Sequence, residues 1–83
     1  MFELWEWVIF PGERYEAKAH SAGTKEMLMV VQGKVGAVVA GEVFEAGPGK
    51  GLLLETDVPH EYHCVGRREV RFRMVVVEGA GGG

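Results

Sequence analysis

The sequence is poor in the features that mark secreted or membrane proteins. Cysteine occurs once, as Cys64, so an intramolecular disulfide and a cysteine-cluster metal site are both excluded. The longest apolar stretches, such as Met27 to Val31, are far shorter than the ~18 residues that would span a bilayer. The start, Met1-Phe2-Glu3, has no basic segment leading into an apolar core. These absences predict a cytoplasmic protein that is not embedded in a membrane.

Positive charge is also scarce. The chain carries 9 Lys and Arg against 12 Asp and Glu, a formal net charge of -3. Nucleic-acid binders concentrate basic residues on one face in order to neutralise phosphates. The densest basic run, from Arg67 to Arg73, is interrupted by Glu69, and we interpret it as solvated turn and strand positions. We therefore expect no nucleic-acid binding by this chain alone.

The length allows a single domain. A chain of 83 residues leaves no room for a second, because independent domains rarely have fewer than ~50 residues. A hydrophobic content of 47% with 25% charged residues is ordinary for a folded globular domain. So short a chain buries only a little over ~60% of the surface that its unfolded form exposes. We therefore expect oligomerisation to add to its stability.

Glycine, in contrast, is plentiful and divides the chain into short segments. These segments are rich in Val, Leu, Phe and Met, which is typical of consecutive strands in a barrel or sandwich. The alternation of Tyr15, Ala17 and Ala19 favours a strand there over a helix. We expect one domain over residues 1–78 and a flexible Gly-rich tail over 79–83. The predicted strands lie near Leu4–Phe10, Arg14–His20, Glu26–Val31, Val35–Val39, Glu42–Glu45, Gly51–Leu54, Glu61–Cys64 and Val70–Val77.

Three side chains form a set with chemical potential: His20, Glu26 and His60. Two imidazoles and one carboxylate can bind a divalent transition metal on one face and leave its other positions open. His20 and Glu26 flank a turn that contains Gly23, and His60 follows Pro59 at the start of a later strand. A barrel can bring all three together, so we predict a shared pocket.

Each of the three residues also has a simpler explanation. His20 can end an exposed strand, Glu26 can accept hydrogen bonds from turn amides, and His60 can bond a backbone carbonyl of the preceding turn. For any one residue alone, this explanation is the stronger. Only their joint occurrence favours a functional site.

Two motifs of the chain resemble those of the cupin superfamily. The first family motif has the order H-x-H, E, G, and its frame is occupied by His20, Ala22, Glu26 and Gly33, in the segment HSAGTKEMLMVVQG. The second has the order G, P-x-G, H, N, and its frame is occupied by Gly49, Glu55, Asp57, His60 and Cys64. Only Gly49 and His60 match the second motif. The resemblance implies an all-β fold, a small cupin-type double-stranded β-helix or jelly-roll barrel.

The departures from this pattern bear on the cofactor. Metal-binding cupins usually present three His and one Glu, whereas Ala22 stands at the second His position and Cys64 at the terminal Asn. The resemblance implies one divalent transition metal ion (Fe, Mn, Ni or Zn) held by His20, Glu26 and His60. The loss of one ligand is also what a barrel shows when it has exchanged metal binding for organic-ligand binding.

Strand alternation predicts the companions of these residues in a cavity. His60, Tyr62 and Cys64 share one strand face, and Glu26 shares another with Leu28. If His60 and Glu26 point inward, then Leu28, Tyr62 and Cys64 line the site that binds a small-molecule ligand. A nucleophilic Cys64 would need a neighbouring base, and we assign no catalytic residue.

The first strand is apolar on both faces. Trp5, Trp7 and Ile9 lie on one face, and Leu4, Val8 and Phe10 lie on the other. In so small a domain, a strand covered on both sides suggests that one face meets an identical chain. We therefore predict a homodimer.

Two functions of different kinds follow from these observations. The wording of HSAGTKE and TDVPHEYH looks most like the cupin domains at the C-terminus of bacterial helix-turn-helix regulators. That resemblance implies a small-molecule sensor, the effector-binding part of a transcriptional regulator. The alternative is a metal-dependent oxygenase or isomerase that uses a 2-His-1-Glu site. A purely structural barrel is a third hypothesis, because a fold does not determine a function.

Overall fold

The computed structural model describes residues 2–79, so residues 80–83 of the predicted tail lie outside the described residues. The described chain is built from strands, with no helix, and thus offers no helix that could cross a membrane. Each strand predicted from the sequence is present, at the following bounds: β1 Phe2–Ile9, β2 Arg14–Ala17, β3 Lys25–Gln32, β4 Lys34–Val39, β5 Glu42–Ala46, β6 Gly51–Glu55, β7 His60–Val65 and β8 Val70–Val77.

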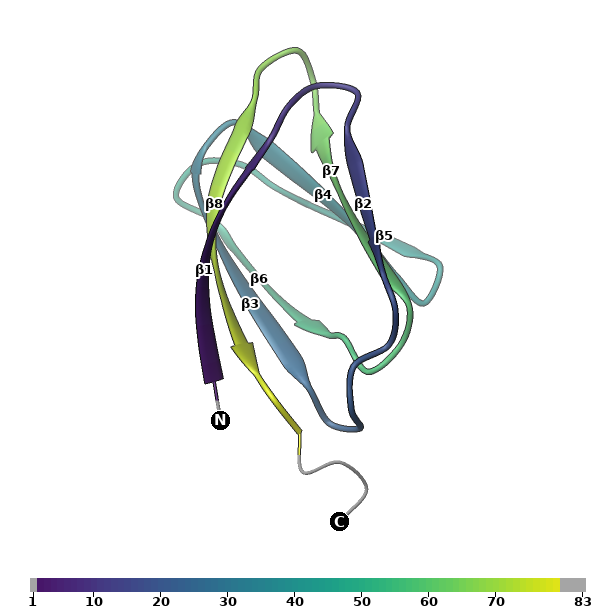
Figure 1. Ribbon diagram of the computed structural model, residues 1–83. Helices are drawn as coiled ribbons and strands as arrows, with labels where there is room; N and C mark the ends of the chain where they lie inside the picture. Colours follow the sequence, from purple (N-terminus) through teal and green to yellow (C-terminus); the bar gives the residue numbers. More distant parts are fainter. Residues whose placement is uncertain (1, 80–83) are drawn as a thin grey trace.

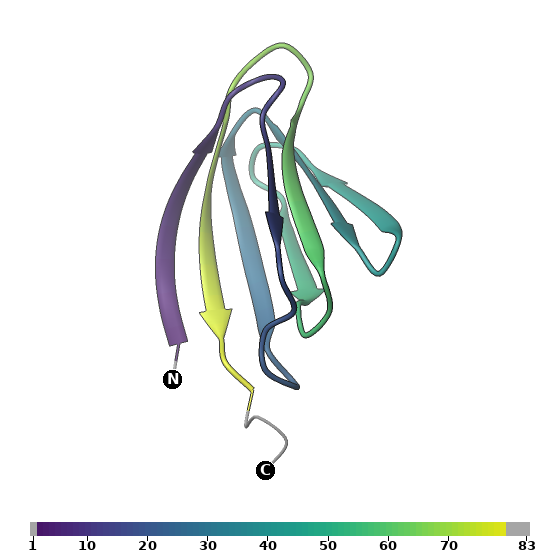
Figure 2. The same ribbon diagram turned by 45° about the vertical axis from the view of Figure 1, so that its right-hand side comes forward.

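The strands form two four-stranded antiparallel sheets that face each other (Figures 1 and 2). One sheet has the order β1-β8-β3-β6 and the other β2-β7-β4-β5, so every neighbouring pair except β4 and β5 joins strands that are not consecutive in the chain. This arrangement is the predicted jelly roll. The two sheets are not joined into one closed ladder, and β1 and β2 are edge strands of opposite sheets.

The hydrophobic core lies between the sheets. Buried and exposed residues alternate strictly along β3 from Lys25 to Val31, and β8 follows nearly the same pattern. As a result Leu28, Val30, Phe72 and Met74 point inward and are almost completely buried. Each such side chain contributes about 1.5–3 kcal/mol relative to an exposed one. The two central strands of the first sheet therefore supply much of the stability.

One strand is shorter than predicted, and the difference matters for the site. β2 was expected to run from Arg14 to His20, but it ends at Ala17. β2 ends there because its partner strand β7 begins opposite it: Ala17 pairs with His60, the first residue of β7. The residues after Ala17 therefore have no strand to pair with. His20 therefore lies in the loop between β2 and β3, where its N–H donates to the carbonyl of Thr56 at 3.0 Å.

Gly33 makes the tight connection between β3 and β4 possible. Its φ of 74° lies in the left-handed region, and a Cβ at this position would come within 2.4 Å of the Glu69 carbonyl oxygen. A side chain is excluded both by the backbone angle and by this contact. The glycine that closes the first motif thus has a structural role in positioning β3, the strand that carries Glu26.

Candidate metal and ligand site

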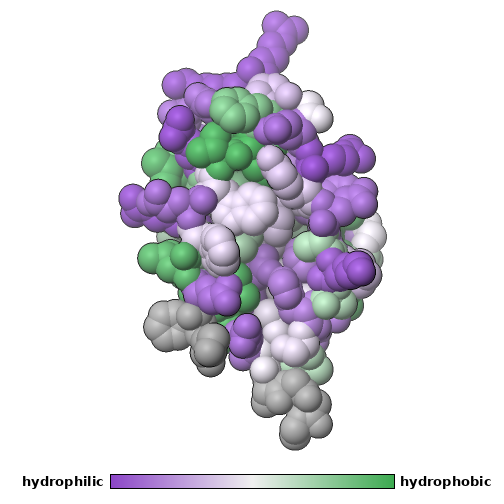
Figure 3. Space-filling view, in the orientation of Figure 1, coloured by the Kyte–Doolittle hydropathy of each residue, from purple (hydrophilic) through white to green (hydrophobic). Residues whose placement is uncertain are grey.

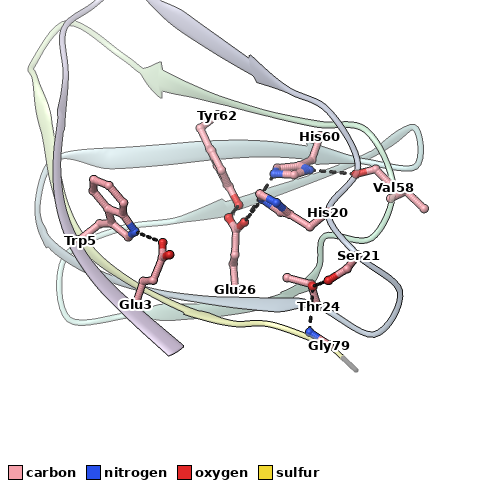
Figure 4. Close-up of polar contacts among 10 residues, drawn as sticks. All are labelled: Glu3, Trp5, His20, Ser21, Thr24, Glu26, Val58, His60, Tyr62 and Gly79. Atoms are coloured by element: carbon pink, nitrogen blue, oxygen red, sulfur yellow. Dashed lines mark hydrogen bonds and ion pairs between the residues drawn. The ribbon is translucent and has the colours of Figure 1, made fainter. Parts of the chain in front are cut away.

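Residues from both sheets meet at one end of the interior. Glu26 lies on the inner face of β3 and is 2% exposed, and His60 begins β7 in the facing sheet. His20 reaches the same place from the β2–β3 loop, with 43% of its side chain exposed. Figure 4 shows both imidazoles turned toward the Glu26 carboxylate. The structure therefore brings together the three residues that the sequence singles out.

Their ligand atoms are close enough to share one ion. His20 Nε2 lies 2.8 Å from Glu26 Oε2, and His60 Nε2 lies 3.6 Å from the same oxygen. One ligand atom from each residue lies within 4.8 Å of the other two. Two ligands that each sit ~2.1 Å from a metal at a right angle are about 3 Å apart. The donor set and its spacing thus fit a divalent transition metal.

The hydrogen bond on the far side of His60 defines which of its nitrogens can bind. Its Nδ1 lies 2.8 Å from the Val58 carbonyl oxygen, which can only accept, so Nδ1 carries the proton. In the neutral ring, Nε2 then presents its lone pair toward Glu26. A histidine oriented in this way by a carbonyl is typical of metal ligands. The simpler explanation considered for His60, a bond to the turn before it, is therefore also correct.

Tyr62 holds the other oxygen of Glu26. It follows His60 on the same face of β7, and its hydroxyl donates to Glu26 Oε1. Burial of the phenol, the hydrogen bond to Glu26 and the negative charge of that carboxylate all raise the pKa of Tyr62 far above its ordinary value. Tyr62 therefore stays a neutral donor, and it leaves Oε2 of Glu26 to face the two histidines.

The loop that carries His20 is held by hydrogen bonds within itself and to neighbouring segments. The Gly23 N–H donates to Asp57 Oδ2 at 3.0 Å, and Thr24 N donates to the Ser21 carbonyl at 3.1 Å. The Gly79 N–H, just beyond β8, donates to Thr24 Oγ1 at 2.9 Å (Figure 4). The tail predicted from the sequence begins at this glycine. The half-exposed His20 thus sits on a loop held by several hydrogen bonds.

A cavity of about 480 Å³ opens from this cluster toward the gap between β1 and β2. In the orientation of Figure 3, the middle of this face is pale, with hydrophilic side chains on both sides. The volume lies within the ~300–1,000 Å³ range of small-molecule sites. Besides the three candidate ligands, the lining is mainly aromatic and apolar and comprises Trp5, Trp7, Tyr15, Tyr62, Ala17, Met74 and Val76, with Glu3, Glu16, Ser21, Thr24 and Glu78.

The residues predicted to bind a ligand are placed differently. Tyr62 lines the cavity. Leu28 is fully buried in the core, and neither it nor Cys64 is among the lining residues. Cys64 lies near the end of β7, where its Sγ donates to the Arg68 carbonyl at 2.9 Å. Alternation predicts which side chains of a strand point inward. It does not predict which of those inward side chains line the cavity and which pack in the core.

Sequence reasoning missed the aromatic wall of this cavity. Trp5 and Trp7 were considered only as part of a strand that meets a partner, yet both line the cavity. Trp7 stacks on Phe72 at 5.9 Å and meets Tyr15 edge-on at 5.4 Å between ring centroids. Alternation places Glu3, Trp5 and Trp7 on a single strand face, but this strand is apolar on both faces, so no local signal shows which face lines a cavity.

Comparison with known families agrees with the fold. The model of the cupin domain family matches residues 5–78. The chain therefore belongs to the cupin domain family. No curated protein matches it significantly.

Solved structures with the same fold include domains of transcriptional regulators. The cupin domain of an XRE family transcriptional regulator from Enterobacter cloacae superposes with a TM-score of 0.87 at 27% identity, over 94% of this chain and 82% of that one. An HTH_3 family transcriptional regulator from Vibrio cholerae gives a TM-score of 0.86 at 20% identity, over 94% of this chain but only 43% of the regulator. A de novo designed double-stranded β-helix gives a TM-score of 0.72 at 22% identity, over 90% of this chain and 99% of the design. At these identities, the last two show the fold alone.

Proposed function

We propose that this cupin domain binds a small organic molecule in its interior cavity and acts as the sensor part of a cytoplasmic transcriptional regulator. The cavity is the observation that carries the proposal, because it combines an aromatic wall with a few convergent polar groups at its deep end. The likeness to the Enterobacter regulator domain supports the regulatory role. Contact with DNA would belong to another part of such a regulator, since this chain has a net charge of -3.

The two tryptophans allow a direct test of ligand binding. The chain has only Trp5 and Trp7, and both line the cavity, so a ligand that enters it changes the intrinsic fluorescence. We expect at least one compound of a metabolite library to produce a saturable change and to raise the melting temperature. The half-buried Ala17 lines the cavity, so Ala17→Phe should abolish binding. Ala19→Phe, two residues further along and outside the cavity lining, is the matched control.

The second candidate function is a metal-dependent enzyme, and the His20, Glu26 and His60 cluster favours it. A bound divalent ion would act as a Lewis acid at its open positions. His20 and His60 would hold it together with Glu26, whose Oε2 faces Nε2 of both histidines. Tyr62 would orient the carboxylate through its other oxygen. A library that yields no ligand for a protein carrying one tightly held metal per chain would favour this function over the sensor.

We also propose that the domain forms the homodimer expected from the first strand. On the outer face of the β1-β8-β3-β6 sheet, cross-strand pairing places four apolar residues in one row, Leu4, Val75, Met27 and Leu53. Three of these are largely exposed, whereas such patches on soluble monomers are usually small. The rows beside it pair an acid with a base, Glu6 with Arg73 and Glu55 with Lys25. Because each neighbouring row holds an acid beside a base, a second copy that covers the apolar row need not bring two like charges together.

A further inference from the structure

The carboxylates of the cavity lining face no fixed positive charge. Four carboxylates line it: Glu3, Glu26 and Glu78 come from β1, from β3 and from the chain just after β8, which are neighbours in one sheet, and Glu16 comes from β2 in the other. No lysine or arginine of the described chain lines this cavity, where the basic groups are the imidazoles of His20 and His60. Together with the net charge of -3, this lining produces a field that attracts cations.

The register of the sheet places two of these carboxylates on the same inner surface. Val76 of β8 pairs with Glu3 on one side and with Glu26 on the other. Their Cα atoms are therefore two strand spacings apart, about 10 Å. Glu3 is held in place because the Trp5 indole N–H donates to its Oε1 at 3.0 Å (Figure 4). A ligand lying across Val76 would meet a buried carboxylate and an exposed one.

At the deep end of the cavity, His20 Nε2 lies within hydrogen-bond distance of Glu26 Oε2, at 2.8 Å, but no donor bridges that oxygen and His60 Nε2. The His60 side chain is 1% exposed, and its Nε2 faces Glu26 Oε2 at 3.6 Å, which is beyond hydrogen-bond distance. Since Nδ1 of His60 already donates to Val58, a neutral His60 can only accept at Nε2. A primary ammonium group has three donors and no acceptor, so it can bridge these two atoms. A carboxylate offers only lone pairs and cannot.

The aromatic wall suits the same class of ligand. Trp7, Tyr15 and Tyr62 line the cavity, and both tyrosine rings stand steeply inclined to Trp7, at 83° and 63°. Aromatic faces attract organic cations through their quadrupoles while they bury the attached hydrocarbon. We propose that this cavity selects small organic cations bearing a primary ammonium group over neutral or anionic molecules of the same size. This inference rests on the proposed ligand-binding function.

Three compounds that share a phenyl ring and differ in charge test the proposal: 2-phenylethylamine, 2-phenylethanol and phenylacetate. Each is titrated into the protein in the presence of a chelator, which keeps metal ions off the same acceptor atoms, and Trp5 and Trp7 report binding by fluorescence. We expect 2-phenylethylamine to bind at least about tenfold more tightly than 2-phenylethanol, which corresponds to the loss of one charge-assisted contact. We expect no saturable signal from phenylacetate.

A pair of variants on β1 locates the charge effect. Glu3→Gln keeps an acceptor for the Trp5 N–H but removes the charge, and it should weaken the amine at least about threefold while leaving the alcohol unchanged. Glu6→Gln removes a carboxylate from the opposite face of the same strand, where Glu6 pairs with Arg73, and should change neither affinity. Equal losses in the two variants would mean that the charge of the whole chain, and not the cavity, attracts the amine.

The outcomes separate this inference from the function on which it rests. Saturable binding of phenylacetate or 2-phenylethanol with an affinity equal to that of the amine would overturn the selectivity for cations, while the cavity would remain a ligand site. If none of the three changes the fluorescence or the melting temperature, and the metabolite library also yields nothing, both the selectivity and the ligand-binding function are wrong.

Discussion

The Tyr62 hydroxyl on β7 donates to Oε1 of Glu26 on β3, and this bond joins the two sheets at the deep end of the cavity. Both residues are almost fully buried. The bond satisfies one oxygen of a buried carboxylate and directs the other toward His20 and His60. Packing of the core and organisation of the site therefore depend on the same contact.

Replacing Tyr62 with Phe should lower the free energy of unfolding by about 1–3 kcal/mol, because a buried carboxylate oxygen loses its donor. Urea denaturation followed by circular dichroism measures this change. Tyr15→Phe is the matched control, since Tyr15 is 41% exposed, and it should cost much less. A Tyr62→Phe variant as stable as the wild type would show that the bond contributes nothing to the fold.

The raised pKa of Tyr62 predicts a specific behaviour in alkali. Because the folded state holds the Tyr62 proton more tightly than the unfolded chain, this residue contributes stability that is complete below pH 10.0, its ordinary pKa, and is lost as the pH rises beyond that value. In Tyr15→Phe, where Tyr62 is the single tyrosine, ultraviolet absorbance should show no phenolate until the protein unfolds. Phenolate absorbance near pH 10 in a protein with native circular dichroism would contradict the pKa shift.

Metal binding can be measured by elemental mass spectrometry on protein purified without a histidine tag. If the 2-His-1-Glu cluster is occupied, we expect iron, manganese, nickel or zinc in the wild type and its loss in His60→Ala. His63→Ala is the control, because His63 lies on the same strand but outside the cluster. Metal that persists in His60→Ala would mean that another site holds it.

The homodimer predicts a mass twice that of the 9.1 kDa chain by light scattering at micromolar concentration. Met27→Glu places a charge in the exposed apolar row and should yield monomers. Val43→Glu is the control, because Val43 is 63% exposed but belongs to the other sheet. A wild-type monomer would exclude the proposed interface.

The β1 strand shows where prediction from sequence reached its limit. Strand alternation predicts the inner face when the other face is exposed, as on β3, where Glu26 and Leu28 lie on the buried face. β1 is apolar on both faces, so its pattern cannot tell which face is inside. Its inward face, with Glu3 and Trp7, was therefore missed as a cavity wall. The end of β2 was missed for a related reason, because it depends on where β7 begins.

The sequence by itself determined the all-β fold, the approximate bounds of its strands, and the residue types able to form a site, since local alternation, glycine spacing and side-chain chemistry are properties of short segments. Only the tertiary structure decided that His20 reaches Glu26 from a loop and that β1 contributes the aromatic wall. It also separated Cys64 from the cavity. Cross-strand register and the depth of a cavity arise from contacts between residues far apart in the chain, and no local pattern contains them.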